Sequence, residues 1–99
     1  MITKVYKKLV ELIELGEPAA VVTVVETKGS APARPGFKML VDARGRNAGT
    51  VGGGVLEAEA VQEALKAMDN NSCKLYQRQL TPQEAESSGM ICGGEVTLF

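Results

Sequence analysis

The segment AAVVTVVET at residues 19–27 constrains the fold more than any other part of the chain. It is a run of mostly β-branched residues with little alternation between polar and apolar positions, which predicts a strand that is buried on both faces and central in its sheet. The next nine residues, KGSAPARPG (28–36), contain two prolines and two glycines. These residues exclude a helix and interrupt any strand ladder, so a shaped loop is expected to follow the strand.

The other elements follow from hydrophobic periodicity. Helices are expected at 4–15, with apolar Val5, Leu9, Leu12 and Ile13, and at 55–68, with apolar Ala58, Val61, Leu65 and Met68. Further strands are expected at 37–42 and 47–51, which form a hairpin, and at 73–80 and 95–99, with a loop at 81–89. The order predicts an α+β fold in one domain, residues 1–99, with two helices and one mixed β-sheet of about five strands.

Composition excludes several classes of function. A net charge of -1 provides no basic field that would bind nucleic acid. No apolar run approaches the length of a membrane span. We therefore expect a cytoplasmic protein that binds neither nucleic acid nor a membrane. The chain has no histidine, and its two cysteines, Cys73 and Cys92, lie in unlike contexts. A structural disulfide and a tetrahedral zinc site are therefore not expected, and Cys73 is interpreted as structural.

The glycine run Gly52-Gly53-Gly54 stands between the hairpin and the second helix. It matches neither the dinucleotide fingerprint nor the phosphate loop. Two interpretations remain open: a tight turn that needs positive φ angles, or a cradle of backbone N–H groups for a ligand. Glu57, in the first helical turn, is either a solvated residue that complements the helix dipole or an acceptor for a ligand with two adjacent N–H donors.

Two further segments could carry chemistry. Residues 28–46 hold five basic and one acidic side chain, and Arg34 lies between two prolines, which favours either a preorganised site for a carboxylate or phosphate or ordinary surface charge. Cys92, in GMICGG (89–94), is either a thiol exposed by its flanking glycines, suited to a soft metal, or a small buried hydrophobic residue.

The segments VVETKGSAPARPGFKMLVDARG, GTVGGGVLEAEA and GMICGGEV together resemble the N-terminal domain of the XdhC/CoxI family, over roughly residues 9–99. The resemblance implies an accessory protein rather than an enzyme. It would bind molybdenum cofactor (molybdopterin) transiently and assist its delivery to a xanthine dehydrogenase-like molybdenum hydroxylase apoenzyme.

The resemblance also implies the residues of a cofactor site. Those that match the family motifs are Gly29, Ser30, Pro32 and Gly36, then Gly52, Gly53, Gly54 and Glu57, then Cys92, Gly93 and Gly94. Arg34 or Lys38 would bind the cofactor phosphate, Glu57 the pterin edge, and Cys92 would lie near the metal.

The chain departs from the family pattern in two ways. Some relatives have a cysteine where this chain has Val55, and typical members continue into a second, Rossmann-like domain. We therefore expect a separate Rossmann-like partner or a homo-oligomer, and a cysteine desulfurase is a further candidate partner. Two alternatives to cofactor binding remain: a sulfur-relay or redox protein that uses Cys92, and a protein-interaction module without a ligand.

Overall fold

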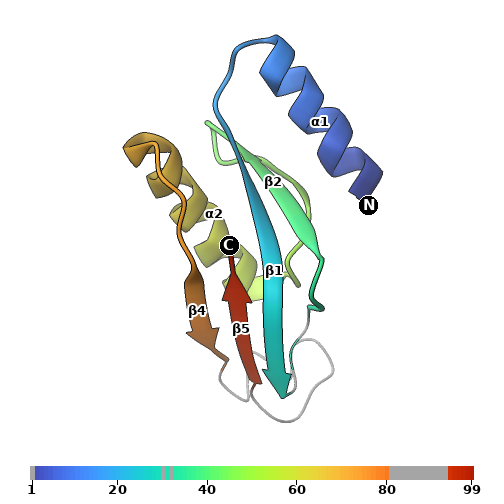
Figure 1. The fold of residues 1–99 in the computed structure, drawn as a ribbon, viewed down its shortest axis with the longest axis vertical. Helices are drawn as coiled ribbons and strands as arrows, with labels where there is room; N and C mark the ends of the chain where they lie inside the picture. Colours follow the sequence, from blue (N-terminus) through green and yellow to red (C-terminus); the bar gives the residue numbers. More distant parts are fainter. Residues whose placement is uncertain (1, 30, 32, 81–93) are drawn as a thin grey trace.

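The structure is a computed structural model that describes residues 2–29, 31, 33–80 and 94–99 (Figure 1). Its elements are α1 (Ile2–Glu14), β1 (Ala19–Gly29), β2 (Lys38–Asp42), β3 (Asn47–Gly49), α2 (Gly54–Asn70), β4 (Tyr76–Gln79) and β5 (Gly94–Leu98). The expected order of helices and strands is confirmed, and so is the single α+β domain. No helix in the described part of the chain is long and apolar enough to cross a membrane.

The five strands form one sheet in the order β3-β2-β1-β5-β4, so β1 is central, as the run at 19–27 predicted. Each recorded pair of neighbouring strands is antiparallel, and the expectation of a mixed sheet is corrected in this respect. The reason lies in the connections. A parallel pair needs a crossover between adjacent strands, but the crossover helix α2 joins β3 and β4, which lie at opposite edges.

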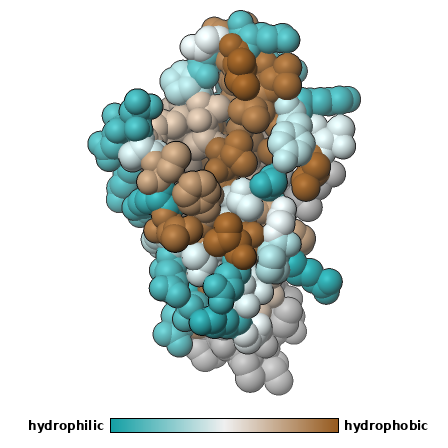
Figure 2. Space-filling model, viewed as in Figure 1, coloured by the Kyte–Doolittle hydropathy of each residue, from teal (hydrophilic) through white to brown (hydrophobic). Residues whose placement is uncertain are grey.

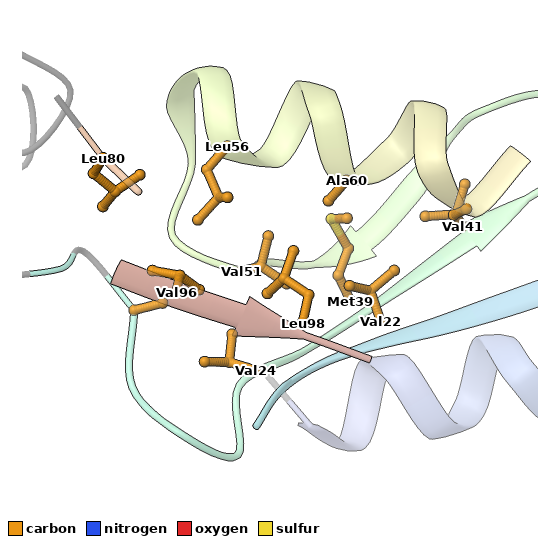
Figure 3. Close-up of a cluster of buried hydrophobic side chains, with 12 residues drawn as sticks. Val22, Val24, Met39, Val41, Val51, Leu56, Ala60, Leu80, Val96 and Leu98 are labelled. Carbon is orange, nitrogen blue, oxygen red and sulfur yellow. The ribbon is translucent and has the colours of Figure 1, made fainter. Parts of the chain in front are cut away.

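The two helices cover opposite faces of the sheet. Along β2, Met39 and Val41 belong to the larger hydrophobic cluster with α2, whereas Leu40 belongs to a smaller cluster with α1. This division follows from the alternation of side chains along a strand. Figure 3 shows Leu56 and Ala60 directed from α2 toward the sheet.

The buried faces of the helices differ from the expected ones at two positions. Ile13 is 65% exposed, because α1 contacts the sheet through Val5, Leu9 and Leu12 on an adjoining stripe. Ala58 is also exposed. The deepest positions of α2 are Leu56, Ala60 and Ala64, and the predicted Val61, Leu65 and Met68 flank them. Small alanines let α2 approach the sheet closely.

Cys73 differs from its expected role as well. The fourth strand begins at Tyr76 rather than at residue 73, and Cys73 is an exposed free thiol before it. The expected loop at 81–89 lies outside the described residues.

Candidate functional site

Two of the three motif segments meet at one end of the sheet. Gly29, the last residue of β1, is paired with Gly94, the first residue of β5. The backbone N–H of Leu80 donates to the carbonyl oxygen of Gly94 at 2.7 Å. Leu80 and Gly94 therefore lie together near the end of β1, where the chain enters the GSAPARPG loop, at the lower end of the view in Figure 1.

The glycine turn lies at the same end of the molecule. Val51 before the turn and Leu56 after it are buried in the cluster that also contains Leu80 and Val96, which flank segment 81–93 (Figure 3). Ala33, from the GSAPARPG loop, is buried in this cluster too. Described residues within or next to the three segments thus belong to one hydrophobic cluster, although they are far apart in the sequence.

The three glycines have the backbone conformation that only glycine adopts readily. Their φ angles are +123°, +78° and +63° for Gly52, Gly53 and Gly54. A Cβ atom built on Gly53 or Gly54 would meet nothing within 4 Å. The tight turn is therefore real, and the space above these two glycines is free of the described residues.

Glu57 acts as an internal acceptor for this turn. Its Oε1 accepts hydrogen bonds from the backbone N–H groups of Val51 and Gly53, both at 3.2 Å, and from the Thr50 hydroxyl. The Thr50 hydroxyl oxygen in turn accepts from the N–H of Gly52 at 3.0 Å. One carboxylate oxygen thus organises the turn that precedes its own helix.

The second carboxylate oxygen of Glu57 is less engaged. Oε2 accepts from the side-chain amide of Asn47 at 3.4 Å, which is a long hydrogen bond. The N–H groups of Gly54 and Val55 have no acceptor in the described part of the chain, and both residues are exposed. Neither interpretation of Glu57 from the sequence was complete, because the residue is bound to its own loop and not simply solvated.

Lys38 and Arg34, the two basic residues predicted to bind the phosphate, lie in different surroundings. The Lys38 ammonium donates to the Thr23 hydroxyl at 3.0 Å. Lys38 shares its face of β2 with Leu40, which packs against α1, so its side chain lies on the opposite face of the sheet from Glu57. Arg34 is exposed, and its carbonyl oxygen accepts from the N–H of Phe37 in the turn through Gly36. The N–H of Gly36 donates to the Val24 carbonyl oxygen at 2.8 Å, which fixes this turn against β1.

Four predicted site residues, Ser30, Pro32, Cys92 and Gly93, lie outside the described residues. The predicted contact between Cys92 and a metal therefore stays a prediction. In the described ranges, no group of three or more histidine, cysteine, aspartate or glutamate side chains could hold a metal ion.

The structure adds a link between α2 and β4 that the sequence reasoning missed. Glu59 accepts from the Tyr76 hydroxyl at 2.7 Å and from the Arg78 guanidinium at 2.8 Å. The hydrogen bond to Glu59, together with burial, raises the pKa of Tyr76. The carboxylate therefore fixes β4 relative to α2. The alternation of residues along β4 did not indicate these contacts between β4 and α2.

An apolar cavity of about 120 Å³ lies elsewhere, between the C-terminal half of α2 and the sheet. None of the predicted site residues lines it. Glu63 at its edge is paired with Lys74, and this contact lowers the pKa of the Glu63 carboxyl group despite partial burial.

Comparison with known proteins identifies relatives of this chain. The profile of the XdhC and CoxI family matches residues 12–77. Two Escherichia coli K12 proteins are similar: the uncharacterized protein YqeB, 32% identical over 95 residues, and the molybdenum cofactor insertion chaperone PaoD, 37% identical over 92 residues. These matches cover 96% and 90% of this chain but only 17% and 28% of the two relatives.

A solved structure confirms the fold. A Bacillus halodurans protein described as a xanthine dehydrogenase superposes with a TM-score of 0.73 over 93% of this chain and 28% of its own. The sequence identity is 22%, so this likeness concerns the fold alone.

Proposed function

The chain belongs to the XdhC and CoxI family, and from this premise we propose that it is an accessory domain that binds molybdenum cofactor transiently and assists its delivery to a xanthine dehydrogenase-like molybdenum hydroxylase apoenzyme. The similarity to PaoD, whose name describes a molybdenum cofactor insertion chaperone, supports this class of cargo.

One observation supports the proposal: described residues within or beside the three motif segments lie at one end of the sheet. The pairing of Gly29 with Gly94, and the burial of Val51, Leu56 and Ala33 in one cluster, bring them together. A ligand recognised by all three segments needs this geometry. Segments with purely local roles in turns would have no reason to share an end of the molecule.

Each group has a proposed role in the site. The N–H groups of Gly54 and Val55, which have no acceptor among the residues that the structure describes, and the exposed Arg34 are suited to the anionic part of the cofactor. The Oε2 atom of Glu57, held only by a long bond to Asn47, is suited to a pterin N–H edge. Ser30, Pro32 and Gly36 would shape the loop, and Cys92 with Gly93 would approach the metal. Lys38 has no role in this proposal because its side chain lies on the other face of the sheet.

The test is retention of cofactor released anaerobically from a molybdenum enzyme, measured as molybdenum and pterin fluorescence that co-elute with the protein on gel filtration. Gly53→Ala should lower retention. Gly16→Ala is the control, because both glycines have positive φ angles, +78° and +69°, and neither would bring a Cβ atom into contact. Because Gly53 also has a ψ angle of -174°, the thermal unfolding of Gly53→Ala is measured beside its retention, to separate backbone strain from loss of the site. Equal retention by both variants would contradict the proposed site.

The role of Cys92 is tested separately. Cys92→Ser should lower the retention of molybdenum more than that of the pterin. Val55→Cys, which places a thiol at an exposed position beside the glycine turn, should raise the retention of molybdenum. Protein that retains the cofactor should also restore activity to a cofactor-free xanthine dehydrogenase. No retention at all would overturn the proposal, and a persulfide formed on Cys92 by a cysteine desulfurase would then favour the sulfur-relay alternative.

A further inference from the structure

The outer face of α1 carries a second apolar stripe that the fold does not use. Ile2, Tyr6 and Val10 follow one another at intervals of four residues and Ile13 comes three later, so all four lie along one side of the helix. They are 47%, 47%, 52% and 65% exposed. The side of α1 that packs against the sheet is formed by other residues.

The surface over α1 is also shaped. A shallow hollow on the helix is lined by Ile2, Tyr6 and Val10, with Lys7 and Glu11 beside them. In Figure 2, hydrophobic surface extends over the upper part of the molecule, where α1 lies in Figure 1, with hydrophilic side chains beside it. A stripe with a hollow between its side chains can accept side chains of another helix.

The charges of α1 are arranged against its own dipole. Lysines occupy the N-terminal half, at Lys4, Lys7 and Lys8, and glutamates the C-terminal half, at Glu11 and Glu14. The first turn has no acidic residue and the last turn no basic one. The opposite arrangement would stabilise an isolated helix, because it complements the helix dipole. The observed order therefore does not serve the stability of α1 itself.

Three of these five charges also have no ion-pair partner in the described ranges. Lys8 and Glu11 form an exposed pair at 3.4 Å. Lys4, Lys7 and Glu14 form no salt bridge with any residue that the structure describes. Lys7 and Glu14 are two helical turns apart and lie on the same flank of the exposed stripe.

We propose that α1 is the interface of a homodimer, in which the exposed stripe packs against the same stripe of a second copy with the two helices antiparallel. An antiparallel arrangement whose two-fold axis passes beside Val10 and Glu11 places Lys7 of each helix opposite Glu14 of the other. The charge order that is unfavourable within one helix then becomes attractive across the pair. A two-fold interface needs such a self-complementary surface. The inference is independent of cofactor binding.

The interface is small, because a 13-residue helix is about 20 Å long. We therefore expect a monomer and dimer in concentration-dependent equilibrium, measurable by sedimentation velocity of the full chain. Val10→Ser should shift this equilibrium to the monomer without unfolding the protein, since Val10 is half exposed. Leu75→Ser is the control, because Leu75 is 66% exposed but lies far along the chain, before β4.

Charge exchange tests the orientation. Lys7→Glu makes this flank of the helix acidic and Glu14→Lys makes it basic, so each variant alone should dimerise less than the wild type. The two variants mixed together should associate again, because each now offers the charge that the other lacks. The double variant that carries both changes should also recover the wild-type equilibrium.

Three results would overturn the proposal. A monomer at every concentration would show that the stripe serves another partner. A dimer unaffected by Val10→Ser would place the interface elsewhere. A mixture of Lys7→Glu and Glu14→Lys proteins that does not associate would exclude the antiparallel arrangement.

Discussion

At the scale of single residues, the glycine turn and Glu57 show what could be predicted and what could not. Three consecutive glycines before a helix predicted positive φ angles, and all three have them. The sequence did not reveal that Glu57 accepts hydrogen bonds from Thr50 and Val51. That contact depends on the hairpin ending directly beside the start of α2, and no local pattern encodes this approach.

Replacing Glu57 should loosen the turn. Glu57→Ala removes the acceptor for the N–H groups of Val51 and Gly53, which are then left to water. We expect a loss of about 1–2 kcal/mol in the free energy of unfolding in urea. Glu57→Gln, which keeps one oxygen acceptor, should lose less. Gln62→Ala, at an exposed position of the same helix, should change stability little. Equal losses for Gln62→Ala and Glu57→Ala would contradict this role of the carboxylate.

Gly49 is a second residue where glycine is required, for a different reason. Its φ angle is +81°, and an added Cβ atom would overlap the Lys38 carbonyl oxygen and lie 2.7 Å from Cγ2 of Val5. Gly49→Ala should therefore destabilise the protein by about 2 kcal/mol more than Gly16→Ala, which is strained but meets no neighbour. Thermal unfolding of the two variants measures this difference. Equal losses would show that the Val5 contact relaxes freely.

At the scale of the elements, the β2–β3 hairpin is held by a buried carboxylate. Oδ1 of Asp42 accepts from the N–H groups of Arg44 and Arg46, both at 2.9 Å, and Oδ2 accepts from the Arg46 guanidinium at 3.1 Å. Burial alone would raise the pKa of Asp42, but these hydrogen bonds and the Arg46 charge outweigh it and lower the pKa below 3.8. The DARGR segment predicted a turn, but it did not reveal that the aspartate is 5% exposed.

The lowered pKa makes the stability of the hairpin depend on pH. Because the folded-state pKa is lower than the unfolded value, the contribution is complete above pH 3.8 and is lost as the pH falls through the folded-state pKa. Asp42→Asn, which mimics the protonated form, should cost about 1–2 kcal/mol at pH 7. The gap to the wild type should narrow in acid. Urea unfolding of Asp42→Asn and of the wild type at pH 7 and in acid measures this difference in stability. Asp69→Asn, at an exposed position, is the control. A gap independent of pH would contradict this account.

At the scale of the whole molecule, the fold class and the central strand were predictable, whereas the meeting of the segments was not. The run at 19–27 predicted a central strand because mostly β-branched apolar residues are typical of one. Its predicted burial on both faces was wrong in part, because only Val22 and Val24 in this run are buried and Val25 is 45% exposed. The pairing of Gly29 with Gly94 joins residues far apart in the sequence, and periodicity carries no information about such a register. Ile13 was assigned to the core because the apolar arc of α1 is wider than the part that the sheet covers.

The two layers should unfold together. Met39, on the α2 side, and Leu40, on the α1 side, are neighbours in one strand and almost wholly buried. Met39→Ala and Leu40→Ala should each cost about 2–5 kcal/mol and shift one common transition. Urea unfolding followed by circular dichroism and by hydrogen exchange of α1 would test this. Separate loss of α1 in Leu40→Ala would show that the helix is an independent unit.

The strand order has a consequence for synthesis on the ribosome. β5 is made after the other four strands of this sheet, yet it lies between β1 and β4. Until residues 94–98 have emerged, β1 has no partner on one side, and β4 has no neighbour in the sheet. The nascent chain can form β1, β2 and β3 as they emerge. The apolar side chains of Val24 and Leu56 then lack part of their cover until β5 inserts.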